Sequence, residues 1–355
     1  MSPSYYKELT MKNSVYFILT VIMVISMCVS APVFGQSKAG TSAAPELLIP
    51  VGAAGIATAG ANISSIAGPD AIFWNPAGLD VMNQSASALF SYRSYIADMG
   101  VSYLAVAGKV EKVGSFGLSL RAFNVGDINV TTEFQPDGTG EIISPTFFTL
   151  GLTYSRMLTE RVSIGATTNL VSERFGNVSA SGVAFDAGVQ YRGLAGVKGL
   201  SLGVSIKNIG TSMKYDGSAL YVKAAADGYE REYTYYKVSA ATSQMPSVIQ
   251  IGLGYETKVA NETMLRVNGT FENNNYGIDE YRIGAEATYA NLLILRTGYL
   301  YSTDPSGTES IFQNFAVGGG VDLAKSLNIP ITVEYAYVPV KYFDGNHVFD
   351  IRINF

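Results

Sequence analysis

The sequence predicts an all-β fold, a transmembrane antiparallel β-barrel of about fourteen strands with an N-terminal plug (hatch) inside its lumen. Three observations predict it. Hydrophobic residues make up 48% of the chain and charged residues only 15%. The only apolar run long enough for a membrane helix lies at the start, whereas a helical membrane protein of this size needs several. Most of the remaining chain alternates polar and apolar residues, as strands with two different faces do.

Residues 1–35 are predicted to be a signal peptide, with Met11 as an alternative start. An apolar run from Val15 to Val29 follows a basic residue, and small or tolerated residues precede Gln36. This order is typical of a cleaved export signal. A retained anchor helix is the alternative. Cys28 is the only cysteine and lies inside the run, so we expect no disulfide in the mature chain.

The predicted barrel covers residues 85–355. In the segment 183–191, one parity carries Val, Phe, Ala, Val and Tyr, while the other carries Ala, Asp, Gly and Gln. A soluble sandwich also alternates but turns its apolar face inward, whereas a membrane barrel turns it toward lipid. Alternating segments of this kind begin near residues 85, 99, 115, 146, 162, 182, 200, 247, 263, 281, 292, 313, 331 and 347.

The connectors provide an independent check, because barrels of this class have short periplasmic turns and longer outer loops. The expected short turns lie at about 110–114, 157–161, 192–199, 256–262, 290–291 and 324–330. The expected long loops lie at about 125–145, 209–246, 272–280 and 302–312. Every second connector is therefore short, as a barrel requires, although the tyrosine-rich loop 209–246 could contain an additional hairpin.

The chain ends on an alternating strand whose last residue is Phe355. A terminal strand ending in Phe resembles the signal read by the outer-membrane barrel assembly machinery. We therefore interpret Phe355 as an assembly signal and expect contact with that machinery and with outer-membrane lipid.

Residues 36–84 lack strand alternation and are rich in Gly and Ala. Small residues let backbone segments pack closely in a confined space. The residue before a proline is restricted to extended or turn geometry, which applies to Asn75 before Pro76. Trp74 is the only tryptophan in the chain. The segment is therefore predicted to be a compact plug within the barrel.

The run from Asp70 to Leu79, Asp-Ala-Ile-Phe-Trp-Asn-Pro-Ala-Gly-Leu, resembles the N-terminal signature of the PorV/PorQ family. That family belongs to the wider FadL-like group. The resemblance implies fourteen strands, a bacterial outer membrane and an internal hatch whose motif is formed by Trp74, Asn75, Pro76, Ala77 and Gly78. For PorV it implies a cargo shuttle of type IX protein secretion, with the secretion translocon and the C-terminal signal domains of cargo as partners.

The residues that carry chemistry favour a protein that is not an enzyme. The only histidine, His347, lies at the end of the last predicted strand, where a solvated side chain is favoured over a Ser–His pair. The sequence 137–141 lacks the repeated acidic spacing of a calcium loop. Glycines 318–320 have no following helix, which excludes a dinucleotide fingerprint. We therefore expect no cofactor and no metal, and the net charge of −5 argues against nucleic acid.

Charged residues on the polar parity of the strands are predicted to form a lumen-facing polar network. One interpretation is that they pair with one another and with the plug, and the other is a binding or conduction path for a ligand. Their mixed signs favour pairing. The set comprises Arg121, Asp186, Arg266, Arg282, Glu286, Arg296, Glu334, Asp350 and Arg352.

Three functions fit this barrel. The first is an accessory or cargo-shuttle component of type IX secretion that binds proteins through its outer loops. The second is a FadL-like passive transporter of hydrophobic small molecules, and the third is a purely structural barrel. Clustered exposed aromatic residues commonly anchor interfaces, and the loop 209–246 offers Tyr215, Tyr221, Tyr229, Tyr233, Tyr235 and Tyr236.

Overall fold

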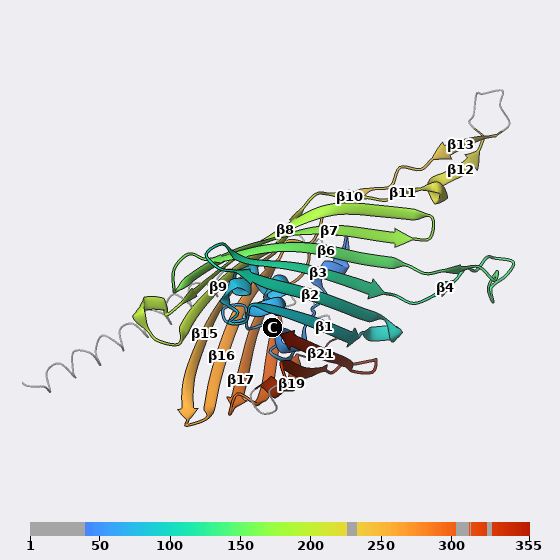
Figure 1. The fold of residues 1–355 in the computed structure, drawn as a ribbon. Helices are drawn as coiled ribbons and strands as arrows, with labels where there is room; N and C mark the ends of the chain where they lie inside the picture. The colour runs from blue at the N-terminus through green and yellow to red at the C-terminus, as the bar shows by residue number, and fades with distance from the viewer. Residues whose placement is uncertain (1–39, 226–232, 303–311, 313, 325–328) are drawn as a thin grey trace, which may run out of the picture. The chain divides into compact units, whose positions relative to one another are not determined.

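The computed structural model describes residues 40–225, 233–302, 312, 314–324 and 329–355 (Figure 1). The predicted signal peptide, residues 1–35, lies outside the described residues, as does Tyr229. Among the described helices, none is both long and apolar enough to cross a membrane.

Fourteen antiparallel strands form a closed ring, as predicted. Each strand pairs with its neighbour along the chain, β8 pairs with β9, and β1 pairs back with β21, so the ring has no free edge. In a closed ring, every backbone N–H and C=O group of a strand can form a hydrogen bond to a neighbouring strand without water. The strands are β1 Ala86–Ser94, β2 Gly100–Val110, β3 Gly114–Asn124, β6 Thr146–Met157, β7 Val162–Phe175, β8 Val178–Arg192, β9 Leu200–Gly210, β15 Val248–Ala260, β16 Thr263–Asn274, β17 Glu280–Tyr289, β18 Leu293–Ser302, β19 Phe315–Asp322, β20 Ile331–Val338 and β21 Asn346–Asn354.

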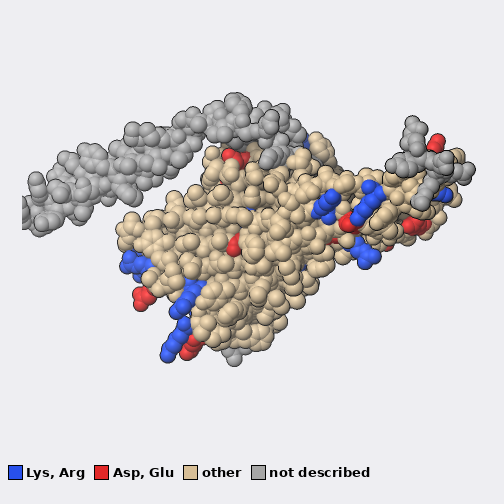
Figure 2. Space-filling model, turned by 90° about the horizontal axis from the view of Figure 1, so that it is seen from above, with Lys and Arg blue, Asp and Glu red and all other residues tan. Residues whose placement is uncertain are grey.

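The two faces of the sheet are inverted relative to a soluble protein. Along β3, Leu118 is 53% exposed while Ser115 and Ser119 are buried. Leucine, valine, isoleucine and phenylalanine dominate the outer face of the described strands, and serine, threonine and asparagine the inner face. On the face that Figure 2 shows, charged side chains are sparse over the middle of the molecule and gather toward its two ends. The outer face therefore suits lipid.

The expected turns from 110–114 to 290–291 are short, as predicted, whereas the connectors on the other side range from the two-residue turn at 176–177 to the loops 125–145 and 211–247, and these two long loops carry structure of their own. In one, β4 Ile128–Asn129 pairs with β5 Ile142–Ile143. In the other, β10 Met213–Lys214 pairs with β14 Thr242–Ser243, and β11 Asp216–Gly217 adds to β8. This loop also contains the hairpin of β12 Tyr221–Ala224 and β13 Thr234–Lys237, called the outer hairpin below. Short 3-10 helices follow β1, β8 and β11, at Ile96–Asp98, Leu194–Gly196 and Ser218–Leu220.

Strand β8 begins at Val178, four residues before the expected position near 182. The residues Ser179, Ala180, Ser181 and Gly182 are all small, so they show little contrast between polar and apolar parity. A two-residue turn, Gly176–Asn177, nevertheless pairs them with the end of β7. Register set by a tight turn thus extends the hairpin beyond what alternation alone indicates.

The described part of the hatch, residues 40–84, lies inside the ring as a series of short helices. Glycine and proline punctuate it, which keeps each helix to six residues or fewer. Its helix α2 packs against β18, β19 and β20, whereas η3 packs against β6, β7 and β8. The elements are η1 Pro45–Leu48, α2 Ala53–Ala57, η2 Gly68–Asp70, α3 Ala71–Trp74 and η3 Pro76–Val81.

Glycines in the wall let the hatch backbone approach the strands directly. A Cβ atom at Gly298 of β18 would overlap the backbone at Thr58 and Ala59, and one at Gly188 of β8 would overlap the side chain of Asn75. Neither position leaves room for a methyl group. At these two positions the hatch therefore lies at van der Waals distance from the strand backbone.

The close approach at Gly298 generates a prediction. We expect Gly298→Val to weaken hatch docking by about 1–3 kcal/mol, because overpacking forces the backbone of the hatch away. Trp74, the only tryptophan, lies buried in the hatch, so its fluorescence in a urea titration reports undocking.

The matched control is Gly269→Val, because Gly269 of β16 has only one atom, the carbonyl oxygen of Arg282, within 4 Å of an added Cβ. Its titration should overlay that of the wild type. Equal midpoints for Gly298→Val and the wild type would contradict the role of the glycine.

Candidate functional site

The hatch motif is centred on a buried tryptophan. Trp74 is 3% exposed, and its Nε1 donates to the carbonyl oxygen of Val51 at 3.0 Å. The ring of Phe73 meets it edge to face, with centroids 5.1 Å apart. A buried indole needs a hydrogen-bond acceptor, and Val51 supplies it from the preceding part of the hatch. The indole therefore joins two segments of the hatch.

Asn75 is fully buried and connects the hatch to the wall. Its Nδ2 donates to the carbonyl oxygen of Ile63 at 2.9 Å, and the carbonyl oxygens of Val189 in β8 and Val204 in β9 lie at 3.2 and 3.4 Å. Its Oδ1 accepts from the backbone N–H of Ala77 at 3.2 Å, which caps η3. The backbone of Asn75 is extended, as the following proline predicts.

The residues after Asn75 complete the contact with the wall. Pro76 begins η3 and lies against Gly165 of β7. The carbonyl oxygen of Ala77 accepts from Ser155 Oγ of β6 at 3.1 Å. Gly78 lies so close to the carbonyl oxygen of Ile66 that a side chain there would overlap it. These three motif residues therefore pack directly against the wall or against another part of the hatch.

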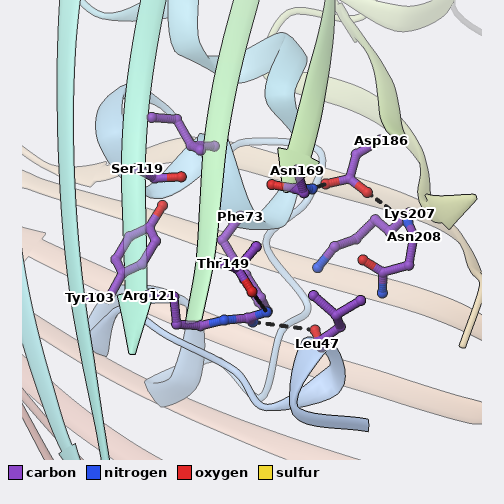
Figure 3. Close-up of a pocket in the computed structure, with 11 residues that line it drawn as sticks. Leu47, Phe73, Tyr103, Ser119, Arg121, Thr149, Asn169, Asp186, Lys207 and Asn208 are labelled. Carbon is purple, nitrogen blue, oxygen red and sulfur yellow. Dashed lines mark hydrogen bonds between the residues drawn. The ribbon is translucent and has the colours of Figure 1, made fainter. Parts of the chain in front are cut away.

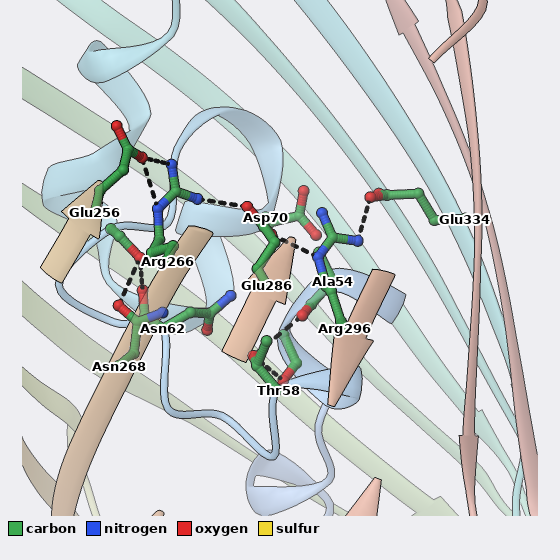
Figure 4. Close-up of polar contacts among 12 residues, drawn as sticks. Ala54, Thr58, Asn62, Asp70, Glu256, Arg266, Asn268, Glu286, Arg296 and Glu334 are labelled. Atoms are coloured by element: carbon green, nitrogen blue, oxygen red, sulfur yellow. Dashed lines mark hydrogen bonds and ion pairs between the residues drawn. The ribbon is translucent and has the colours of Figure 1, made fainter. Parts of the chain in front are cut away.

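Seven charged side chains of alternating sign form a ladder along the inner wall, called the charge ladder below (Figure 4). Arg266 pairs with Glu256 and, at 2.7 Å, with Glu286. Arg296 pairs with Glu286 at 2.7 Å and with Glu334 at 2.6 Å. Arg352 joins Glu334 at 2.9 Å to Asp70 of the hatch at 2.5 Å.

Strand register explains the charge ladder. Arg266 of β16 lies directly opposite Glu256 of β15 and Glu286 of β17, and Glu286 lies opposite Arg296 of β18. Directly opposed side chains on one face are within contact distance. Strand β19 contributes glycines 318–320 at this level, so Arg296 reaches across it to Glu334 of β20. The glycine run therefore makes room for an ion pair.

The wall holds the hatch at a second acidic position. Asp350 of β21 accepts from the backbone N–H of Ala53, the first residue of α2, at 2.5 Å. Asp70 and Asp350 both lie close to Gly52, where an added Cβ would be 2.7 Å from Asp70 Oδ1 and 3.9 Å from Asp350 Oδ2. The end of the ladder and the start of α2 are therefore joined at one point.

The remaining residues of the predicted network form two further groups. Arg282 pairs with Glu272 at 2.8 Å and with Glu280 at 2.5 Å, away from the charge ladder. Asp186 accepts from Asn169 Nδ2 at 2.8 Å and from the Asn208 backbone N–H at 2.6 Å. Arg121 donates to neutral oxygens, described below. All nine predicted residues lie on the inner face, and the structure brings six of them into the ladder and the Asp350 contact.

At the outer end of the lumen, a carboxyl group of the hatch lies next to a carboxyl group of the wall. Glu46 of η1 is buried beside Glu173 of β7, and Glu173 Oε2 accepts from the phenol of Tyr215 at 2.5 Å. Burial, and secondarily the Glu173 carboxylate, raise the pKa of Glu46 to about 8. Burial and Glu173 also raise the pKa of Tyr215. Glu46 is therefore neutral when the hatch is docked near neutral pH.

Sequence reasoning missed Asp70, Glu46 and Lys207 as site residues. Lys207 shares the polar parity of β9 with Ser201 and Ser205, so that signal was present. Asp70 and Glu46 lie in the aperiodic hatch, where no alternation indicates which side chains meet the wall.

The predicted strand-end position of His347 agrees with an exposed side chain on the barrel surface. Its Nδ1 lies 2.7 Å from the phenol oxygen of Tyr335. In the described part of the chain, no group of three or more His, Cys, Asp or Glu side chains is placed to hold a metal ion. Phe355 closes the seam, donating its N–H to the carbonyl oxygen of Ala86 at 2.8 Å.

A closed fourteen-strand barrel that is apolar outside, polar inside and filled by its own N-terminal segment defines an outer-membrane β-barrel with a hatch. A sequence model of the type IX secretion system protein PorV matches residues 34–222, more than half of the chain. The chain therefore belongs to the PorV family, which confirms the resemblance, and the bacterial outer membrane is its location. No curated protein matches the sequence.

Solved structures share the fold at low sequence identity. CymD, a monoaromatic hydrocarbon channel, is 14% identical with a TM-score of 0.58, covering 87% of this chain and 98% of that chain. A deltaS2S3 mutant of the monoaromatic hydrocarbon channel TodX is 14% identical with a TM-score of 0.56, covering 86% and 99%. The Pseudomonas putida toluene transporter TodX is 13% identical with a TM-score of 0.52, covering 84% and 96%. These likenesses show the fold alone.

The contact between Asp70 and Arg352 predicts an effect on hatch docking. We expect Asp70→Asn to weaken docking by about 1–3 kcal/mol, because the partly buried guanidinium of Arg352 loses one charged partner while Glu334 remains. The measurement is the urea midpoint for exposure of Trp74. As a control, Glu256→Gln at the far end of the charge ladder, where the side chain is 39% exposed, should change the midpoint by less than about 1 kcal/mol. Equal effects of the two variants would be inconsistent with a special role for Asp70.

The raised pKa of Glu46 predicts that docking weakens as the pH rises from about 4.5 to about 8. The docked pKa of about 8 exceeds the ordinary value of 4.5. The stabilisation of the docked hatch by Glu46 is therefore fully present below pH 4.5 and is lost as the pH rises toward 8. The docking constant falls by at most about tenfold for each pH unit. Urea midpoints reported by Trp74 between pH 5 and pH 9 test this. Glu46→Gln should flatten the profile, and an unchanged slope in that variant would assign the pH dependence to another group.

Proposed function

We propose that this chain is an accessory or cargo-shuttle component of type IX protein secretion, acting without catalysis through protein contacts at its outer loops. The observation that carries the proposal is the match to the PorV family over residues 34–222. That match includes the hatch, β1–β9 and the start of the outer hairpin. The proposed partners are the secretion translocon and the C-terminal signal domains of cargo, and Phe355 is the proposed signal for the barrel assembly machinery.

The outer hairpin supports a role in protein contact. It carries the strongly exposed aromatic rings Tyr233 and Tyr235, at 63% and 69%, together with Tyr221 and Tyr236. The ammonium groups of Lys223 and Lys237 lie over two of these rings. Figure 1 shows the hairpin lying beyond the ends of β7 and β8. Tyrosine side chains bury much area with little loss of rotamer freedom, which suits a binding surface.

The second candidate is passive passage of hydrophobic small molecules. It is favoured by the fold shared with the monoaromatic hydrocarbon channel CymD and the toluene transporter TodX. In the present structure the hatch lies directly against wall glycines such as Gly188 and Gly298. Passage through the lumen would therefore require the hatch to move, whereas protein contact through the outer hairpin would not.

The deciding experiment compares the secreted proteome of a strain lacking this gene with that of its parent. We expect selective loss of proteins with type IX C-terminal signal domains, restored by the wild-type gene. An unchanged secretome would refute a required role in secretion. Uptake of a monoaromatic hydrocarbon, measured in the same two strains, would then test the second candidate.

Complementation with loop variants locates the contact. We expect the triple variant Tyr233→Ser, Tyr235→Ser, Tyr236→Ser to restore secretion poorly, at roughly a tenth of the wild-type level or less, because aromatic anchors dominate interface energy. Phe134→Ser is the matched control, since Phe134 is an exposed ring in the other long loop. Full restoration of secretion by the triple variant would show that the outer hairpin is not the contact surface, while the role in secretion would stand.

A further inference from the structure

A small cavity lies between the hatch and the wall of the barrel (Figure 3). Its volume is about 30 Å³, which is enough for one or two water-sized particles. The hatch contributes Leu47, Ile72 and Phe73 to its lining, and the wall contributes Arg121 of β3 and Lys207 of β9. The cavity therefore joins apolar side chains of the hatch to two cations of the wall.

Lys207 is a buried cation without an ion pair among the described residues, although Asp186 and Glu272 attract it from a longer distance. The residue is only 6% exposed, and its Nζ lies 3.6 Å from the centre of the Phe73 ring and 5.9 Å from that of Trp74. Among the described residues, nothing forms a hydrogen bond or an ion pair with this ammonium group. Burial of an ammonium group is costly unless it is paired, and a ring face compensates only in part.

Arg121 is the second such cation. Its guanidinium donates to the carbonyl oxygens of Leu47 and Ile49 at 3.4 and 3.5 Å and to Thr149 Oγ1 at 3.3 Å, all neutral acceptors at long distance. It also lies 5.7 Å from the Phe73 ring. No acid within the described residues is within ion-pair distance of it. The other inward arginines named above, in the charge ladder and at Glu272, all have carboxylate partners.

The acid in the lining attracts both cations but forms an ion pair with neither of them. Asp186 accepts from Asn169 Nδ2 and from the Asn208 backbone N–H, and it forms no ion pair with any described cation. The lining therefore carries two positive charges and one negative charge. It also contains the phenol oxygen of Tyr103, which is buried without a hydrogen-bond partner. Two cations and one hydroxyl without a hydrogen-bond partner therefore line the cavity together with a single acid.

We propose that this cavity binds a small free monovalent anion, of the size of chloride or formate, that fastens the hatch to the wall. A compact anion accepts hydrogen bonds from Lys207 Nζ, the Arg121 guanidinium and the Tyr103 hydroxyl, and it neutralises the excess positive charge. Because Leu47 and Phe73 of the hatch close the same cavity, the anion binds tightly only when the hatch is docked. Anion binding and hatch docking therefore stabilise each other.

The first test uses bromide as the probe with the mature full-length chain. Crystals grown in sodium bromide should show an anomalous peak inside the cavity bounded by Lys207 and Arg121. The same crystals of Lys207→Met, which keeps the apolar stem and removes the charge, should lack it. Absence of the peak in the wild type, or its persistence in the variant, would overturn the proposal.

The second test measures hatch docking in solution by Trp74 fluorescence in urea. Chloride replaces gluconate, an anion too large for the cavity, at constant ionic strength. We expect the midpoint of the wild type to rise with chloride, and the chloride concentration for half the effect to rise at least about tenfold in Lys207→Met. Arg266→Met is the matched control, because Arg266 already pairs with Glu256 and Glu286, and it should keep the chloride dependence. A wild-type midpoint independent of chloride would refute the site even if the variants failed to fold.

Discussion

The structure depends on the contact between the hatch and the inner wall of the barrel. A ring of fourteen strands encloses more space than its own inward side chains fill, so another segment has to occupy the lumen. Close packing is possible because glycines such as Gly298 stand where the hatch backbone meets a strand. Asn75 then satisfies carbonyl oxygens of the hatch and of two strands with one amide group. Without this contact, the lumen would be an open polar channel.

Electrostatics follow from the same constraint. Charges placed on one face of neighbouring strands are directly opposed, so alternation of sign lets each charge between the two ends of the ladder pair on both sides. The ladder ends at Asp70, so the hatch is connected by an ion pair to the charge network of the wall. Arg121 and Lys207 depart from this scheme, since they face the hatch across Phe73 rather than another strand. Their environment therefore differs in kind from that of Arg266 or Arg296.

Much of this fold could be predicted from the sequence because strands have a period of two. In β8, Phe185 and Val189 face outward and Asp186 and Gln190 inward, as their parity indicates. Small residues weaken that signal, which is why the start of β8 was placed late. The partners of Asp70 and Glu46 could not be predicted, because the hatch has no repeating period and its contacts join positions nearly three hundred residues apart. The two-residue period of a strand identifies which side chains share a face of the sheet. Only the folded structure identifies which residues meet across the lumen.

The hatch and the outer loops share contacts, and this connects the two regions on which the functional argument rests. The N–H of Ala43 donates to the carbonyl oxygen of Gln244 at 2.9 Å. Leu47 of η1 belongs to one buried apolar cluster with Met213 and Met245 from the loop that carries the outer hairpin. A partner that drew this loop away from the barrel would remove apolar area and a hydrogen bond from the start of the hatch. By the same reasoning, release of η1 would loosen the base of the loop, so binding outside the membrane and docking of the hatch affect each other through residues that already touch.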